Sequence, residues 1–282
     1  MITLFATCGN MYEVKQDHFP DNTLHVSFPD HEIYAIEWKY ESDAELFTLI
    51  CARRHYANSD IQLILPYIPH ARMDRVKDET DVFTLKYFCE IINSLNFSRV
   101  WVLDPHSNVS LALLDRVSQI PVINTINECL NRLVYEIGHD YDTETREKVY
   151  QDLVLFFPDE GSMKRYSSEV DFLPYAFGIK KRDWKTGQIQ GLQLVNGELV
   201  KGKNVLIIDD ICSRGGTFYH AAKALKEAGA TNVYLYITHA ENTMVKGDMY
   251  NDPNLIKKIY TVKTIFDSNL DTLHKVDVIQ NW

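Results

Sequence analysis

The run NVLIIDDICSRGGT at residues 204–217 constrains the fold more than any other segment of this chain. Its first half has the apolar, β-branched composition of a strand, and two adjacent carboxylates, Asp209 and Asp210, precede a glycine-containing turn. Residues 217–228 then repeat apolar side chains at helical intervals, so a helix starts near Thr217. Free backbone N–H groups and the helix dipole converge at such a start, and the run therefore predicts an anion site.

The two carboxylates of this run cannot bind a phosphate themselves. Asp209 and Asp210 suit the hydroxyl groups of a sugar or a hydrated Mg²⁺, so the run predicts a site for a sugar phosphate with metal. Considered alone, the same residues fit equally well a buried strand followed by an N-capped helix that binds nothing.

Composition places the chain among globular proteins that act on small molecules. A length of 282 residues allows two domains, and 45% hydrophobic with 24% charged residues is typical of a folded protein. The formal net charge of −10 argues against general binding of nucleic acid, because no basic block offsets the phosphate backbone. We therefore expect small-molecule substrates and neither a nucleic-acid nor a membrane partner.

The sequence also predicts a cytoplasmic location. The N-terminal residues lack the pattern of a signal peptide, and no apolar run approaches the length that crosses a bilayer. The cysteines are scattered without CxxC spacing, which fits reduced thiols rather than disulfides or a zinc site: Cys8, Cys51, Cys89, Cys129 and Cys212.

Short β-branched runs alternate with helical patterns along the chain, which predicts an α/β fold with parallel sheets. The predicted strands cover residues 2–6, 24–28, 61–65, 100–103, 153–157, 204–208 and 232–238. The predicted helices cover residues 44–56, 84–95 and 217–228. Ligands of such folds bind beyond the carboxyl ends of the strands, where the polar motifs of this chain fall. A polar segment at residues 127–148 places the boundary between two similar halves near residue 145.

The run at residues 204–217 resembles the 5-phosphoribosyl-1-diphosphate binding motif of type I phosphoribosyltransferases. Further segments resemble motifs of the ribose-phosphate pyrophosphokinases: FPDHE at 28–32, PYIPHARMDR at 66–75, DPH at 104–106, FPDEGSMKR at 157–165 and GIKKR at 178–182. The resemblance implies two similar type I phosphoribosyltransferase-like domains with parallel sheets flanked by helices. It implies a pyrophosphokinase domain with the ATP-side motifs at residues 1–145 and a phosphoribosyltransferase-like domain with the ribose-phosphate cradle at residues 146–282.

The same resemblance implies a role for individual residues. Those matched to ATP binding are Phe28, Asp30, Glu32, Arg72, Met73, Asp74 and His106. Those matched to ribose-phosphate binding are Asp209, Asp210, Ser213, Arg214, Gly215, Gly216 and Thr217. His106 and Asp159 match metal ligands, and Lys180, Arg182 and His106 match catalytic residues. Considered alone, His106 would fit a structural histidine and the KKR run a solvated charge cluster.

The activity implied is Mg²⁺-dependent transfer of the β,γ-diphosphoryl group of ATP to the 1-hydroxyl of ribose 5-phosphate, giving 5-phosphoribosyl 1-diphosphate and AMP. Family members are homo-oligomers built on dimers, often hexamers. This chain departs from the family pattern at His70 and Met73, where Tyr and Gln are usual. In the phosphate loop, Ser213, Arg214 and Gly215 replace the usual Asp, Thr and Ala.

These departures leave alternative functions open. Arg214 could pair with a second phosphate, so the acceptor could be a ribose whose 5-phosphate is capped, such as ADP-ribose, giving its 1-diphosphate. A phosphoribosyltransferase would need the cradle but not the ATP-side motifs. A catalytically silent regulatory relative would be expected to lose the basic segment or His106, both of which this chain retains.

Overall fold

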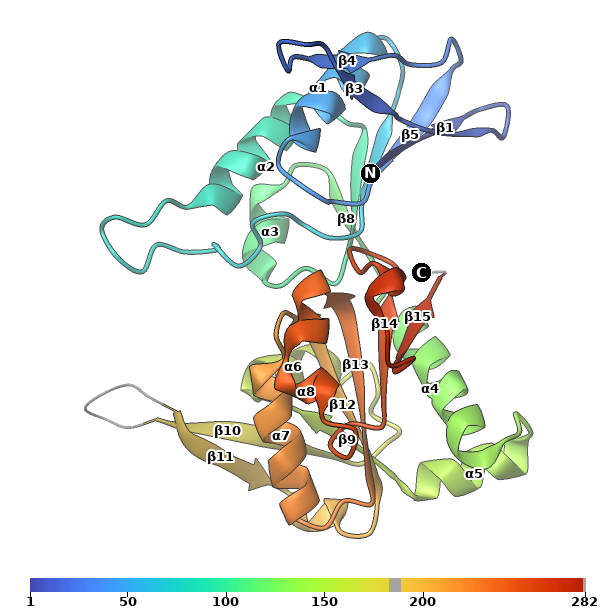
Figure 1. Cartoon of the computed structure of the whole chain (residues 1–282), viewed down its shortest axis with the longest axis vertical. Coiled ribbons are helices and arrows are strands. Elements are labelled where there is room, and N and C mark those ends of the chain that lie inside the picture. The colour runs from blue at the N-terminus through green and yellow to red at the C-terminus, as the bar shows by residue number, and fades with distance from the viewer. Residues whose placement is uncertain (183–188, 281–282) are drawn as a thin grey trace. The chain divides into compact units, whose positions relative to one another are not determined.

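The chain forms two compact units, Met1–Pro121 and Val122–Trp282 (Figure 1). The computed structural model describes residues 1–182 and 189–280, and of residues 180–182 and 189–191 it describes the backbone alone. Within these described ranges, no helix has both the length and the apolar character needed to cross a membrane.

The unit Met1–Pro121 is built on a six-stranded sheet in the order β2-β1-β5-β6-β7-β8. The neighbours from β5 to β8 are parallel, whereas β1 is antiparallel to both β2 and β5. A separate antiparallel hairpin consists of β3 and β4. The strands are β1 (Ile2–Ala6), β2 (Met11–Glu13), β3 (Gln16–His18), β4 (Leu24–Val26), β5 (Ile33–Trp38), β6 (Gln62–Leu65), β7 (Arg99–Leu103) and β8 (Val117–Ile120).

The helices of this unit are α1 (Glu45–His55), α2 (Thr84–Ser94) and the shorter α3 (Asn108–Leu113). Of these, α1 and α2 cover one face of the sheet. Successive side chains of a strand point to opposite faces, so every second residue can enter the same core. Ile36 of β5 and Leu63 of β6 share an apolar cluster with Leu49 of α1 and Phe88 of α2. Burial of this cluster holds the strands whose ends carry the ATP-side motifs.

The unit Val122–Trp282 contains a seven-stranded sheet in the order β11-β10-β9-β12-β13-β14-β15. All neighbours are parallel except β10 and β11, which form an antiparallel pair. The strands are β9 (Leu153–Phe157), β10 (Tyr175–Arg182), β11 (Ile189–Val195), β12 (Asn204–Cys212), β13 (Asn232–Ala240), β14 (Lys258–Val262) and β15 (Val276–Ile279). The helices are α4 (Ile123–Gly138), α5 (Thr143–Gln151), α6 (Glu160–Tyr166), α7 (Gly216–Glu227) and α8 (Asp248–Asn251).

Helices lie on both faces of this second sheet. Leu235 of β13 belongs to the apolar cluster that includes Phe218 of α7. Tyr236, its neighbour in the strand, points to the other face, where its hydroxyl lies 2.6 Å from the hydroxyl of Thr125 in α4. Helices therefore cover both faces of the sheet, with α7 and α4 on opposite faces (Figure 1).

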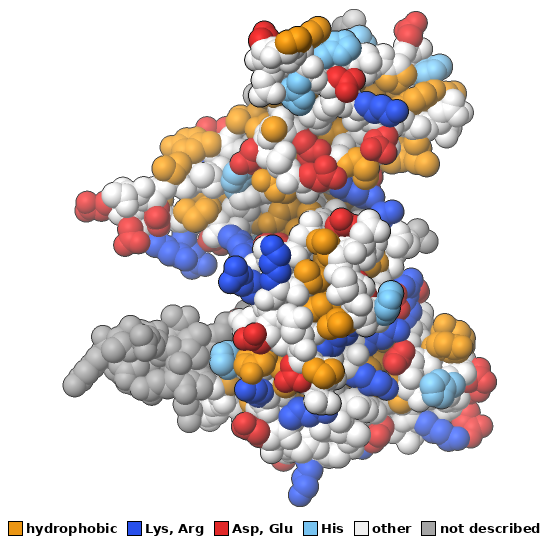
Figure 2. Space-filling view, in the orientation of Figure 1, with side chains coloured by type: hydrophobic (Ala, Val, Ile, Leu, Met, Phe, Trp, Pro, Cys, Tyr) orange, Lys and Arg blue, Asp and Glu red, His pale blue; other side chains and the backbone are white. Residues whose placement is uncertain are grey.

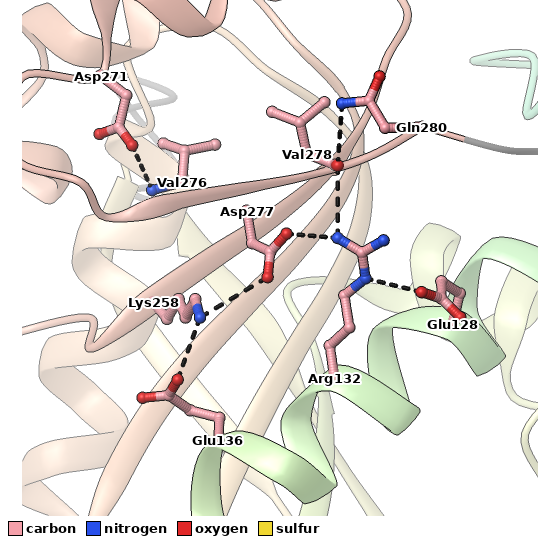
Figure 3. Close-up of polar contacts among 9 residues, drawn as sticks. All are labelled: Glu128, Arg132, Glu136, Lys258, Asp271, Val276, Asp277, Val278 and Gln280. Atoms are coloured by element: carbon pink, nitrogen blue, oxygen red, sulfur yellow. Dashed lines mark hydrogen bonds and ion pairs between the residues drawn. The ribbon is translucent and has the colours of Figure 1, made fainter.

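The polar segment that the sequence placed near a domain boundary is largely the helix α4. Arg132 donates to Glu128 within α4 and to Asp277 of β15, and Lys258 of β14 donates to Glu136 (Figure 3). These pairs attach the charged side of α4 to the second sheet. The compact units accordingly divide between Pro121 and Val122, earlier than the boundary near residue 145, and the functional assignment of the two domains stays a prediction.

The predicted α/β class with two mainly parallel sheets is confirmed. Predicted helices 44–56, 84–95 and 217–228 match α1, α2 and α7 to within one residue at each end. The strand predicted at 24–28 lies in the hairpin instead of the main sheet. The strands that were not predicted are β2, β3, β5, β8, β10, β11, β14 and β15. Acidic and basic side chains are interspersed on the face of the second unit that Figure 2 shows.

Candidate active site

The acidic pair lies inside β12 rather than after it. Strand pairing continues past both carboxylates, because Asp209 is opposite Ile237 and Ile211 is opposite His239 of β13. Asp210 is buried, and its Oδ2 accepts a hydrogen bond from Nη1 of Arg165 at 2.9 Å. The parallel sheet thus fixes the two acids at the carboxyl end of a central strand, the usual place for ligands in this class of fold.

A third carboxylate lies near this pair. Asp159 follows β9 and is the N-cap of α6, where its Oδ1 accepts from the backbone N–H groups of Gly161 at 3.0 Å and Ser162 at 3.1 Å. Burial raises the pKa of Asp209 well above its usual value, and the negative charges of Asp210 and Asp159 raise it further. The predicted ribose-phosphate motif and the predicted metal ligand Asp159 therefore share one electrostatic site in the second unit.

The phosphate loop, residues 213–217, joins β12 to α7. Gly215 has a φ of +72°, in the left-handed region that favours glycine, and a Cβ there would lie 2.9 Å from the terminal methyl carbon of Met249. At Gly216 a Cβ would meet no atom within 4 Å, so open space borders the loop. The backbone N–H groups in the first turn of α7 have no partner within the helix, and this arrangement fits a phosphate group.

Two side chains of the phosphate loop differ in their surroundings. Ser213 is half-buried, and its Oγ lies 3.0 Å from Oγ1 of Thr243. Arg214 is exposed, and its guanidinium has no ion pair or hydrogen bond with the described residues. Thr217 is exposed in the first turn of α7.

In the first unit, the structure brings two of the ATP-side motifs together. Asp74 is 8% exposed, and its Oδ1 accepts from Nε of Arg75 at 2.9 Å. Although burial acts to raise the pKa of Asp74, the nearby hydroxyl of Ser107, the hydrogen bond from Arg75 and the charges of Arg75 and His106 lower it overall. The loop at 66–75 therefore lies beside the segment at 104–107.

Phe28 packs on a different part of the first unit. Its ring centroid lies 5.3 Å from that of His55 and 6.1 Å from that of Tyr56, at the carboxyl end of α1. Asp30 and Glu32, which belong to the same predicted ATP motif, are exposed. Arg72 is also exposed, and Met73 is partly buried. An aromatic ring fixed beside exposed acceptors is suited to a nucleobase, which has an apolar face and polar edges.

The predicted catalytic residues Lys180 and Arg182 belong to β10. Their backbones pair with Leu192 and Ile189 of β11, so this part of the basic segment is a strand. Their side chains and residues 183–188 lie outside the described part of the protein.

The residues present fit a Mg²⁺ ion that is bound together with a substrate. Among the described residues, no group of three or more His, Cys, Asp or Glu side chains has the geometry of a preformed metal site. Mg²⁺ keeps several waters and commonly takes one or two carboxylates plus substrate phosphates, so it needs no such group. Asp159 belongs to the second unit and His106 to the first, and their predicted joint role as metal ligands stays a prediction.

The sequence analysis assigns no role to Arg165, although the FPDEGSMKR motif ends on it. Its position in α6 brings it to Asp210, a residue 45 positions further along the chain. Burial of Asp210 alone would lead us to expect a basic side chain beside it, because a buried carboxylate needs a hydrogen-bonded or charged partner. Nothing in the local pattern showed which basic residue would supply it.

The raised pKa of Asp209 predicts a change of stability with pH. A carboxyl whose pKa is higher in the folded state contributes most stability below its ordinary value of 3.8, and that contribution is lost as the pH rises through the folded-state pKa. Ionisation of Asp209 therefore costs the ligand-free protein stability. Asp209→Asn should raise Tm at pH 7 by about 2–4 °C, the shift that ~1 kcal/mol produces in a protein of similar size.

The difference between Asp209→Asn and the unmodified protein should shrink as the pH falls toward 4, which thermal unfolding at several pH values would measure. Asp171→Asn removes an exposed carboxylate of the same unit and should leave Tm unchanged at every pH. An Asp209→Asn protein that is less stable at pH 7 would contradict the raised pKa.

Known proteins resemble this chain in both sequence and fold. Residues 163–268 match the phosphoribosyl transferase domain family. Ribose-phosphate pyrophosphokinase 1 of Listeria monocytogenes is 30% identical over 232 residues, which cover 79% of this chain and 68% of that protein. Ribose-phosphate pyrophosphokinase of Saccharolobus solfataricus is 24% identical over 239 residues, covering 81% of this chain and 77% of that protein.

The fold agrees with these sequence relatives. The crystal structure of phosphoribosylpyrophosphate synthetase from Mycobacterium smegmatis superposes with a TM-score of 0.71 at 19% identity, covering 95% of this chain and 85% of that one. Both the sequence match and the arrangement of two mainly parallel sheets extend through the two units. The chain belongs to the ribose-phosphate pyrophosphokinase family.

Proposed function

We propose that this protein transfers the β,γ-diphosphoryl group of ATP to the 1-hydroxyl of a ribose phosphate, with ribose 5-phosphate as the favoured acceptor. The products are then 5-phosphoribosyl 1-diphosphate and AMP. The observation that carries the proposal is the acidic pair of β12 beside an open glycine loop at the start of α7. Carboxylates suit sugar hydroxyls, whereas backbone N–H groups suit a terminal phosphate, so the two parts match the two ends of one ribose phosphate.

On the acceptor side, we assign the ribose hydroxyls to Asp209 and Asp210, and the 5-phosphate to the phosphate loop. The pair Arg165–Asp210 holds one carboxylate in a fixed orientation before a ligand binds. Ionised Asp209 lies beside two other negative charges, and hydroxyl donors or a cation would relieve that repulsion. Binding of the sugar would therefore relieve a charge repulsion that destabilises the ligand-free protein.

On the donor side, we assign ATP to the first unit, with the base against Phe28, Asp30 and Glu32. Arg72 would contact the phosphates, His106 would lie beside them and the metal, and Met73 and Asp74 would belong to the same ATP-binding loop. The proximity of Asp74 to Ser107 and His106 brings the loop at 66–75 against the segment at 104–107. A rigid pair of loops lowers the entropy that binding of a flexible triphosphate costs.

The reaction is an attack of the 1-hydroxyl oxygen on the β-phosphorus of ATP, in which the bond from that phosphorus to the α,β-bridging oxygen breaks and AMP leaves. Such transfers depend mainly on positioning and on compensation of negative charge. We assign charge compensation to Lys180 and Arg182. Mg²⁺, when bound, supplies further compensation of the charge on the phosphates, and His106 and Asp159 are the residues we propose to hold it.

Incubation with ATP, Mg²⁺ and ribose 5-phosphate, followed by mass spectrometry of the products, tests the proposal directly. We expect AMP and 5-phosphoribosyl 1-diphosphate in equal amounts. Release of ADP or of free inorganic diphosphate without the sugar diphosphate would refute the assigned reaction. As in other members of the family, we expect the active form to be a homo-oligomer, which sedimentation of the same preparation would show.

The assignment of two separate ligand sides predicts that their affinities can be changed independently. Asp209→Asn combined with Asp210→Asn should weaken ribose 5-phosphate binding about 10-fold or more, because hydrogen bonds to charged groups are lost. Binding of a non-hydrolysable ATP analogue should change little. Phe28→Ala should have the reverse pattern, and calorimetric titration of each ligand measures both.

Phe172→Ala is a matched control for Phe28→Ala, because it removes an exposed ring of the second unit. It should change neither affinity. Loss of nucleotide binding in the double Asp variant would show that the acidic pair belongs to the donor side, contrary to our assignment.

The surroundings of Arg214 support a second candidate acceptor, a ribose whose 5-phosphate is capped. The exposed guanidinium has no partner among the described residues and lies in the phosphate loop, where a bidentate donor can reach a neighbouring phosphate. A capped acceptor such as ADP-ribose carries that second phosphate, and the product would be its 1-diphosphate. The open space beside Gly216 leaves room for an extended ligand at the same loop.

Arg214→Thr distinguishes the two acceptors. If the capped acceptor is used, the variant should lose about 10-fold in kcat/KM for ADP-ribose, as expected for one charge-assisted contact, with little change for ribose 5-phosphate. Steady-state rates with both acceptors measure this. If ribose 5-phosphate is preferred by orders of magnitude and Arg214→Thr leaves both rates unchanged, Arg214 has no part in acceptor choice.

A further inference from the structure

The phosphate loop packs against a segment that contains none of the predicted site residues. This support segment consists of a short 3-10 helix, Asn242–Lys246, followed by Gly247 and α8. A Cβ on Gly247 would lie 1.9 Å from the carbonyl oxygen of Arg214, and Met249 of α8 contacts Gly215. The backbone of the loop therefore rests directly on the support segment.

A chain of hydrogen bonds joins the support segment to Ser213. The hydroxyl oxygens of Ser213 and Thr243 are 3.0 Å apart, and Oγ1 of Thr243 donates to Oε2 of Glu241 over a longer distance of 3.4 Å. An ionised carboxylate only accepts hydrogen bonds, so the proton of Thr243 points toward Glu241. Thr243 must then accept from Ser213, whose own proton is directed toward the support segment.

The far side of the support segment is itself fixed. Nζ of Lys275 is buried and donates to the carbonyl oxygens of Met249 at 3.4 Å, Tyr250 at 3.1 Å and Asp252 at 2.9 Å. A lysine side chain held by three carbonyl groups restrains the end of α8. Movement of the support segment away from the phosphate loop would break these bonds, so the loop rests on a rigid base.

We propose that Thr243 is a positioning residue for acceptor binding, and that it holds Ser213 so that the loop's backbone N–H groups face the terminal phosphate. The inference rests on the function proposed above and extends it to a residue that does not touch the substrate. Ser213 stands where the family usually has Asp, and its hydroxyl is satisfied by the support segment rather than by the phosphate. The cradle is then formed mainly by backbone groups, which are fixed by the loop conformation.

Thr243→Val tests this because it keeps the shape of the side chain and removes the hydroxyl. We expect the KM for ribose 5-phosphate to rise about 10-fold, the effect of losing ~1.4 kcal/mol, with the KM for ATP within about twofold of its original value. Thr243→Ser keeps the hydroxyl and should restore the KM. Thr231→Val alters an exposed threonine at the opposite end of β13 and should have no effect.

Gly247→Ala tests the same support segment by a steric change. The φ of Gly247 is −91°, which any residue adopts, so the alanine acts through its clash with the carbonyl of Arg214. We expect the same selective rise in the KM for ribose 5-phosphate. Thermal unfolding of each variant shows whether it is folded at the assay temperature, and Thr243→Val and Gly247→Ala each carry the test if the other is not folded.

Calorimetric titration with ribose 5-phosphate separates failure of this inference from failure of the proposed function. If the protein binds ribose 5-phosphate but forms no sugar diphosphate, the reaction is wrong, and weaker binding by Thr243→Val still supports the positioning role. If the protein is active and Thr243→Val leaves both the KM and the affinity for ribose 5-phosphate unchanged, the positioning role is refuted. Absence of ribose 5-phosphate binding to the unmodified protein refutes it as well.

Discussion

Negative charge concentrated at the carboxyl end of one parallel sheet is the constraint on which the candidate site depends. The parallel register of β9 and β12 brings the residues that follow or end these strands to the same edge. Asp159 and the acidic pair consequently lie within electrostatic range of one another, and Arg165 compensates part of their charge. The remaining negative charge favours ligands that carry hydroxyl donors or a cation.

The phosphate loop adds the opposite preference a few residues further on. Gly215 allows the left-handed turn that ends β12 and starts α7, and its lack of a side chain lets Met249 approach. The helix start then presents N–H groups to an anion. Acids that suit hydrogen-bond donors, next to a turn that suits an anion, match the two ends of the sugar phosphate that we propose as the ligand.

The sequence predicted those parts of the site that are local in the chain. The carboxylates, the glycine turn and α7 are contiguous, so their order determined their arrangement, and the three predicted helices were placed to within one residue. Partners distant in the sequence could not be predicted: Arg165 reaches Asp210 across 45 residues, and Thr243 reaches Ser213 across 30. Strand β5 was not predicted because it lies between β1 and β6 and is identified by its pairing with them. Helix α4 was not predicted because its charged side chains bind β14 and β15 rather than solvent.

One departure from the family pattern, Arg214, lies where the fold tolerates it. Gly247 contacts the carbonyl oxygen of Arg214, not its side chain, so the backbone position of residue 214 is independent of the side chain that it carries. A residue with a fixed backbone and a solvent-facing side chain can change what the loop recognises without changing the loop itself. The acceptor choice that we propose for Arg214 therefore requires no change in the support segment.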